Sequence, residues 1–155
     1  MDPDQRVPYT LLYHLFRASQ ASRRFMRSAM RDGGYGGEEY AFLSYLYASG
    51  PRSMTAIARE FDVAVTTVAG ILGPAIERGE VERRSIRRDA RMRPLALTEA
   101  GITRHAAAME RYHVRYDALE RSLVEGGLDV EALAAELDEL TEAIRLALDL
   151  DEEVS

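Results

Sequence analysis

The sequence predicts a mostly α fold with a minor α+β element, which is a single short β-hairpin. Along most of the chain, apolar residues recur every three or four positions, the period of an amphipathic helix. Between about residues 81 and 97, this period gives way to the alternation and turn residues of a hairpin. With 155 residues, 46% hydrophobic and 30% charged, the chain has the size and composition of a single globular domain, 1–155.

Glycine and proline divide the first part of the chain into helices. Pro8 suits a first helical position, where its missing N–H costs nothing, and the glycines at 33–37 end the helix that follows. Gly50-Pro51 stops the next helix in the same way. Three helices are therefore predicted, at about 8–31, 38–48 and 55–61.

A fourth helix is predicted at about 65–78, and its sequence is a poor helix former. Ala64 stands where a capping Ser, Thr, Asp or Asn would stabilise the helix start by about 1 kcal/mol. Gly70, Gly73 and Pro74 lie inside the segment, and a proline there costs roughly 3 kcal/mol unless a kink relieves it. We therefore expect a kinked or two-part helix.

The hairpin and two long helices complete the chain. Strands at about 81–85 and 93–97 flank an arginine-rich turn. Thr98 can cap a long helix, and Asp129 can cap the last one after the break at Gly126-Gly127. The apolar positions of the first long helix are spaced alternately by three and four residues, which favours helix-on-helix packing: Ile102, His105, Met109, Tyr112, Tyr116, Leu119 and Leu123.

Two short helices joined by a tight turn and followed by a basic hairpin form a winged helix-turn-helix. The motif is predicted over 38–98, with its wing at about 81–97. The helices at 8–31 and 99–149 flank it. Their long apolar faces are difficult for a chain of this size to cover alone, so they are predicted to form a homodimer.

Charge is distributed unevenly. The chain carries a net charge of −6, yet residues 1–104 hold 16 Arg against 12 acidic residues, and residues 105–155 hold 4 Arg against 14. This difference predicts a basic functional face together with an acidic segment elsewhere. A basic face in a winged helix is typical of DNA binding.

Several function classes are excluded. The absence of cysteine rules out disulfides, thiolate catalysis and Cys-ligated zinc. No apolar run is long enough for a membrane helix or a signal peptide, so we expect a cytoplasmic protein with no membrane partner. We find no nucleophile elbow, phosphate loop or dinucleotide fingerprint, and we expect no enzyme and no cofactor. His105 and His113 do not match a zinc ligand set, and His105 is interpreted as a core or interface residue.

Three motifs in register carry a family resemblance. Asp89-Ala90-Arg91 followed by Leu97-Thr98-Glu99-Ala100-Gly101 matches the wing signature D-x-R…L-T-x-x-G. Residues 78–83 match the helix end K-G-L-V-E-R, and residues 55–68 match S-x-L-A-x-x-L-x-V-x-x-S-T-V. The sequence thus resembles the MarR family of transcriptional regulators, over about residues 39–101.

The resemblance implies a dimeric repressor on a pseudo-palindromic site in double-stranded DNA, released when a small-molecule effector binds. The 65–78 helix would enter the major groove and the wing would approach the minor groove. The residues predicted to contact DNA are the hydroxyls of Thr55, Thr66 and Thr67 and the wing arginines Arg84, Arg87, Arg88, Arg91 and Arg93. The threonines are alternatively helix caps, and Arg91 alternatively pairs with Asp89.

Family members often bind aromatic or phenolic effectors, and Tyr13, Tyr40 and Tyr45 are the residues predicted to line such a pocket, although core packing explains each equally well.

A second function stays open. The glycines and Pro74 leave the fourth helix poor in side chains that read bases. The chain is alternatively a winged-helix dimer that has lost specific DNA binding and acts in protein interaction or ligand sensing.

Overall fold

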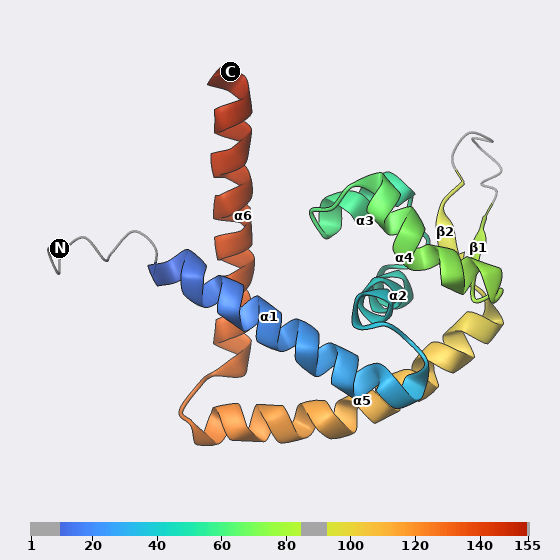
Figure 1. Cartoon of the computed structure of the whole chain (residues 1–155), viewed down its shortest axis with the longest axis horizontal. Coiled ribbons are helices and arrows are strands. Elements are labelled where there is room, and N and C mark those ends of the chain that lie inside the picture. Colours follow the sequence, from blue (N-terminus) through green and yellow to red (C-terminus); the bar gives the residue numbers. More distant parts are fainter. Residues whose placement is uncertain (1–9, 85–92, 155) are drawn as a thin grey trace, which may run out of the picture. The chain divides into compact units, whose positions relative to one another are not determined.

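The computed structural model describes the backbone of residues 10–84 and 93–154 (Figure 1). The described part is helical apart from one two-stranded antiparallel sheet, which confirms the predicted fold class. In chain order the elements are α1 (Thr10–Met30), the 3₁₀ turn η2 (Arg31–Gly33), α2 (Gly37–Ser49), α3 (Met54–Glu60), α4 (Val65–Glu77), β1 (Val81–Arg83), β2 (Leu95–Leu97), α5 (Glu99–Glu125) and α6 (Val130–Val154).

The chain divides into two compact units, Met1–Tyr112 and His113–Ser155. The first unit holds the helix-turn-helix, the hairpin and the first half of α5. The second holds the rest of α5 and α6. The interpretation of 1–155 as a single domain stays a prediction.

A helix-turn-helix is formed by α3 and α4. Ser53 caps α3, because its Oγ accepts a hydrogen bond from the amide of Ala56 at 3.1 Å. The turn bends at Asp62, which has a positive φ of 50°, and the amide of Val63 returns to the carbonyl of Ala58 at 3.0 Å. The two helices therefore pack against each other at a fixed angle in the first unit.

Helix α4 runs unbroken from Val65 to Glu77, so the two-part alternative was wrong, and a kink at Pro74 stays a prediction. Val68, Leu72 and Ala75 are fully buried along one face, and this burial holds the segment in a helical register. Gly70 is exposed on the other side, so water can satisfy the carbonyl that Pro74 leaves without its helical partner. Tertiary packing thus outweighs the poor helix propensity.

The hairpin is shorter than predicted and has a third participant. Val81 pairs with Leu97, Glu82 with Ala96 and Arg83 with Leu95. On its other side, Leu95 exchanges two backbone hydrogen bonds with Arg52, at 3.0 and 2.8 Å. The segment before α3 therefore fixes the base of the wing to the helix-turn-helix, a pairing that no local sequence pattern indicated.

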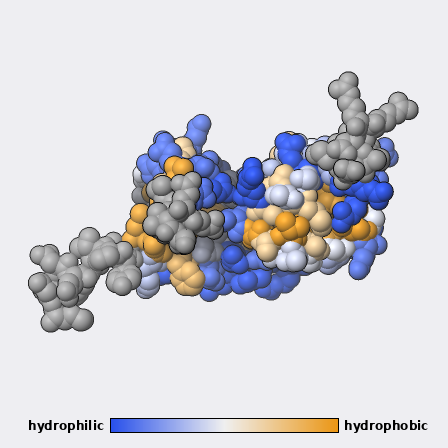
Figure 2. Space-filling model, turned by 90° about the horizontal axis from the view of Figure 1, so that it is seen from above, coloured by the Kyte–Doolittle hydropathy of each residue, from blue (hydrophilic) through white to orange (hydrophobic). Residues whose placement is uncertain are grey.

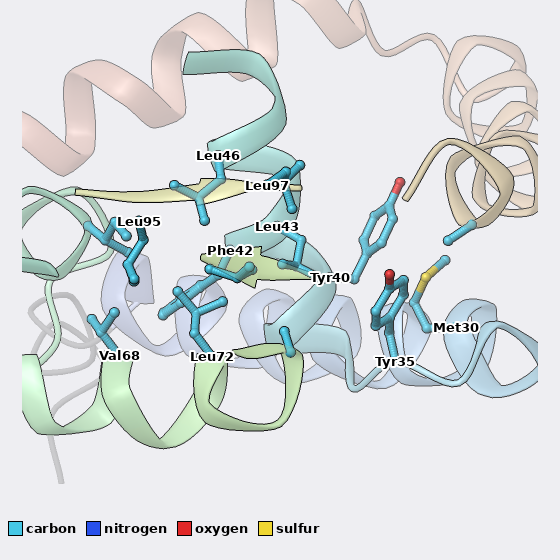
Figure 3. Packing of buried hydrophobic residues seen from close by; sticks show 14 of the residues in the cluster. Met30, Tyr35, Tyr40, Phe42, Leu43, Leu46, Val68, Leu72, Leu95 and Leu97 are labelled. Carbon is cyan, nitrogen blue, oxygen red and sulfur yellow. The ribbon is translucent and has the colours of Figure 1, made fainter. Parts of the chain in front are cut away.

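Helix α2 forms the centre of the first unit and packs against α1, α4 and β2. Its residues Leu43 and Leu46 meet Leu72 of α4 and Leu95 of β2 in the buried core (Figure 3). Each of these four side chains is at most 2% exposed. The core consequently holds α2, α4 and β2 in one close-packed arrangement.

The predicted caps of the two long helices are confirmed. Thr98 Oγ1 accepts from the amide of Gly101 at 3.1 Å and donates to the carbonyl of Gly79 at 2.8 Å. Asp129 Oδ1 accepts from the amide of Ala132 at 3.0 Å at the start of α6. In the second unit, Val130, Leu133, Leu140 and Ile144 of α6 are half-buried, whereas Leu137 is 43% exposed.

Candidate nucleic-acid interface

The first turn of α4 presents two exposed hydroxyls. Thr66 and Thr67 both lie in this turn, and neither side chain makes a hydrogen bond to a described residue. Ala64 at the N-cap supplies no side-chain acceptor, so the helix start has no side-chain cap, and the amide of Thr67 bonds the carbonyl of Ala64 at 2.9 Å. An uncapped helix start with hydroxyls beside it suits a phosphate group.

Thr55 lies in the first turn of α3 and is also exposed. Because Ser53 caps this helix, the hydroxyl of Thr55 is not needed as a cap. The two helix starts of the motif therefore both carry a solvent-facing threonine.

Two of the predicted wing arginines lie where the described part of each strand ends, beyond the Arg83–Leu95 pair. The amide of Arg84 bonds the carbonyl of Pro94 at 2.8 Å, so Arg84 and Arg93 flank the same end of the ladder and both are exposed. The Nε atom of Arg84 lies 3.0 Å from a carboxylate oxygen of Glu82. On the face seen in Figure 2, hydrophilic surface (blue) predominates, with smaller apolar patches (orange). Arg87, Arg88 and Arg91 lie outside the described residues.

The carboxylate of Glu80, the residue before β1, is buried among arginines. Glu80 is 4% exposed and receives two hydrogen bonds from Arg78, from Nε at 2.8 Å and from Nη2 at 3.0 Å. Arg104 of α5 donates a further bond from Nη1 to the same carboxylate. Arg78 Nη2 also lies 2.5 Å from Glu39 Oε1 of α2. We call Glu39, Arg78, Glu80 and Arg104 the Glu80 cluster.

The cluster keeps Glu80 ionised. Burial disfavours its charge, but the hydrogen bonds from Arg78 and the charges of Arg78 and Arg104 outweigh burial and hold the pKa of Glu80 below its usual range. The same bonds raise the pKa of Arg78 against the opposing effect of burial. The four charges cancel, which is the condition under which a buried carboxylate is tolerated.

Tyr35 lies against this cluster. The guanidinium carbon of Arg104 is 4.7 Å from the centre of its ring, and that of Arg78 is 5.7 Å away. The hydroxyl of Tyr35 is buried and has no hydrogen-bond partner among the described residues. Burial, together with the nearby carboxylate of Glu80, raises the pKa of Tyr35 to about 12.

Sequence reasoning missed the Glu80 cluster, although one signal was present. In the helix-end pattern K-G-L-V-E-R, Glu80 stands at the leucine position, the first of two apolar ones. A carboxylate at an apolar position of such a pattern indicates a paired, buried charge.

The three tyrosines predicted for effector binding lie in different surroundings. Tyr40 is buried, and its ring centre lies 5.2 Å from that of His105 and 5.3 Å from that of Tyr112. Tyr45 is half-buried with its ring edge-on to Phe61 at 5.6 Å, and Tyr13 is 56% exposed on α1. Packing thus accounts for Tyr40 and Tyr45 in the described structure, and their role in effector binding stays a prediction.

A cavity of about 510 Å³ lies elsewhere in the first unit, between α1 and the start of α2. Met26, Ala41 and Ile71 supply its apolar wall, and the ion pair of Arg23 with Glu38, at 2.7 Å, lies at its polar side. None of the three tyrosines lines it.

His105 is 1% exposed, its ring also faces Tyr47 at 5.1 Å, and burial lowers its pKa. Its interpretation as a core residue agrees with this position. Across the described ranges, no group of three or more potential ligands could hold a metal ion. No helix in these ranges is long and apolar enough to cross a membrane.

Comparison with known proteins identifies the fold. No family model and no curated protein sequence match the chain. Among solved structures, the transcriptional repressor CouR bound to a 23-mer DNA duplex is 23% identical to this chain, with a TM-score of 0.74; the match covers 85% of this chain and 92% of CouR. NadR in complex with 4-hydroxyphenylacetate is 23% identical, with a TM-score of 0.72; the match covers 87% of this chain and 99% of NadR. MarR from E. coli is 16% identical, with a TM-score of 0.63; the match covers 87% of this chain and 96% of MarR. The chain thus has the winged-helix fold of MarR-family regulators, and the resemblance found in the sequence is confirmed at the level of fold.

Proposed function

We propose that the chain is a dimeric DNA-binding transcriptional regulator of the MarR type. The observation that carries the proposal is the similarity of nearly the whole chain to winged-helix structures solved on DNA, among them CouR and MepR from S. aureus. The similar structures are of transcription regulators rather than enzymes, so catalysis has no place in the proposal.

In this function, α4 enters the major groove of double-stranded DNA. The exposed hydroxyls of Thr66 and Thr67 and the uncapped amides beside them bind phosphate or base edges, and Thr55 contacts the backbone. Arg84 and Arg93 bind the flanking phosphates. Arg87, Arg88 and Arg91 belong to the same proposed interface, in the minor groove.

A second copy of the chain completes the binding unit. Helix α1 exposes Leu11, Leu12, Tyr13 and Phe16, each more than half accessible, and α6 exposes Leu146 and Leu148 to a similar extent. Apolar faces of this size are normally covered by a partner. A two-fold dimer would present two α4 helices to successive major grooves, which requires a pseudo-palindromic site.

The test is fluorescence anisotropy of the purified protein on the DNA upstream of its own gene. A scrambled duplex of equal length is the control, and both are titrated at low and near-physiological salt. A preference of about 10³ or more for the upstream DNA at the higher salt supports specific regulation. Equal binding that fades with salt on both duplexes contradicts it.

Matched charge variants separate wing contacts from net charge. The double variant Arg88→Ala, Arg91→Ala should lose affinity and reduce the salt dependence by about two phosphate contacts. The control double variant Arg24→Ala, Arg31→Ala changes two exposed arginines of the first helical region by the same charge. If both double variants weaken binding equally, the wing is not the contact.

The alternative function is a winged-helix dimer without specific DNA binding, acting in protein interaction or ligand sensing. Gly70, Gly73 and Pro74 favour it, because they give α4 few side chains that can read base edges. A dimer by light scattering that shows no DNA preference would support this alternative.

Release by a small-molecule effector is the finer part of the proposal. Support comes from the cavity between α1 and α2, whose volume suits a small ligand, and from the ligand complex of NadR. With 4-hydroxyphenylacetate as the probe, binding should raise the melting temperature and weaken DNA binding, because an effector must prefer the non-binding state. Met26→Trp fills the cavity and Tyr45→Phe leaves it unchanged, so the two variants distinguish the cavity from the tyrosine site.

A further inference from the structure

We propose that Glu80 is a positioning residue for DNA binding: its buried carboxylate joins Arg78 at the end of α4 to Arg104 of α5, and its backbone begins the wing. The inference rests on the proposed function, because it concerns the geometry of the two elements that would contact DNA. Glu80 itself is buried and would touch no DNA.

Helix α4 needs such an anchor more than an ordinary helix does. Its start lacks a side-chain cap, Gly70 and Gly73 have no atoms within 4 Å of the space a side chain would fill, and Pro74 removes a backbone bond. A helix with these features frays readily on its own. Its buried face holds the middle, and its C-terminal end requires contacts from outside the helix.

The Glu80 cluster supplies those contacts. Arg78 is the C-cap residue of α4 and donates to both carboxylate oxygens of Glu80, from Nε at 2.8 Å and from Nη2 at 3.0 Å. The same guanidinium reaches Glu39 of α2 at 2.5 Å. Arg104 bonds Glu80 from α5. The Glu80 carboxylate therefore links the end of α4 to α5, and Arg78 links it separately to α2.

The backbone of Glu80 transmits this position to the wing. Its amide donates to the carbonyl of Ala75 in α4 at 2.9 Å, and its carbonyl accepts from the amide of Thr98 at 2.9 Å. Val81, the next residue, begins β1. The same residue thus bonds both the end of α4 and the start of the wing, so a displacement of one should displace the other.

Two variants and one control test the proposal in the full-length dimer. Glu80→Gln keeps the shape and removes the charge. Glu80→Leu restores the apolar residue of the helix-end pattern and leaves Arg78 its bond to Glu39. Glu77→Gln is the matched control, since Glu77 lies on exposed α4 surface three residues away and its replacement changes the net charge equally.

Two measurements are made at a temperature where circular dichroism shows every variant folded. Hydrogen exchange of the α4 amides should be at least tenfold faster in both Glu80 variants than in Glu77→Gln, with the α1 amides unchanged. Affinity for the upstream DNA should fall at least tenfold in both Glu80 variants, while affinity for scrambled DNA stays the same. A purely structural role would lower the melting temperature and leave the specificity ratio unchanged.

The proposal is overturned if both Glu80 variants keep the α4 protection and the specificity ratio of Glu77→Gln. If the unaltered protein shows no preference for the upstream DNA, the proposed function fails. In that case, the comparison of α4 hydrogen exchange between the Glu80 variants and Glu77→Gln still tests whether the Glu80 cluster stabilises the helix.

Discussion

Gly101 occupies a position where a single added methyl group should disrupt the first unit. A Cβ atom at Gly101 would lie 2.0 Å from the carbonyl oxygen of Glu80 and 2.9 Å from its carbonyl carbon. Both atoms belong to backbone, and the oxygen already accepts hydrogen bonds from Thr98. The backbones of Gly101 and Glu80 could separate only if the start of α5 moved away from the wing.

The magnitude follows from these distances. Overpacking a rigid site typically costs ~1–3 kcal/mol, and a clash of backbone with backbone belongs at the upper end. Alanine gains about 1 kcal/mol over glycine inside a helix, which offsets part of that cost. We expect Gly101→Ala to lower the free energy of unfolding by about 2 kcal/mol or more, which corresponds to roughly 4–8 °C in melting temperature.

Gly70→Ala is the matched control. Gly70 is also helical, but a Cβ there meets no atom within 4 Å. This variant should raise the free energy of unfolding by about 1 kcal/mol through helix propensity alone. Both variants are compared with the parent protein by thermal melts and urea titrations at one protein concentration, because the proposed dimer makes stability depend on concentration.

The reasoning is refuted if Gly101→Ala is as stable as the parent protein, or if both variants shift stability in the same direction. In the first case the two backbones would have to separate at little cost, and the close approach of α5 to Glu80 would not be a constraint on the fold.

Three further predictions concern polar groups. Tyr35→Phe should change the free energy of unfolding by at most about 1 kcal/mol, since the buried hydroxyl lies near the Glu80 carboxylate but has no partner in hydrogen-bond geometry among the described residues; a larger loss of stability would show that the hydroxyl bonds Glu80. Burial lowers the pKa of His105 in the folded protein, so as the pH falls the unfolded chain takes up a proton at this residue before the folded protein does. The free energy of unfolding should therefore be highest above pH 6.5, the ordinary pKa of histidine, and fall as the pH drops below it. In pH-dependent melts, a His105→Leu variant should show a flatter profile. A similar flattening on replacing the exposed His14 would contradict this assignment. Ser53→Ala should cost about 1 kcal/mol because it removes the cap of α3, and urea titration against Thr55→Ala, which removes no cap, checks it.

Local patterns of the sequence predicted much of this fold. The spacing of apolar residues predicted every helix of the described part, and capping chemistry predicted Thr98 and Asp129 as helix starts. Such signals are local because a helix period and a cap depend on residues three or four positions apart. The wing was recognisable for the same reason. The DNA-contact residues and the effector tyrosines stay predictions.

Tertiary structure alone decided the rest. Glu39, Arg78, Glu80 and Arg104 meet from α2, α4, the start of the wing and α5, and no short-range pattern couples positions 39 and 104. Arg52 pairs with Leu95 across more than forty residues for a similar reason. Burial of Val68, Leu72 and Ala75 kept α4 in one continuous helix, where helix propensity predicted either a kink or a break. Propensity acts residue by residue, whereas core burial acts on a whole helix face at once, so packing determined the outcome.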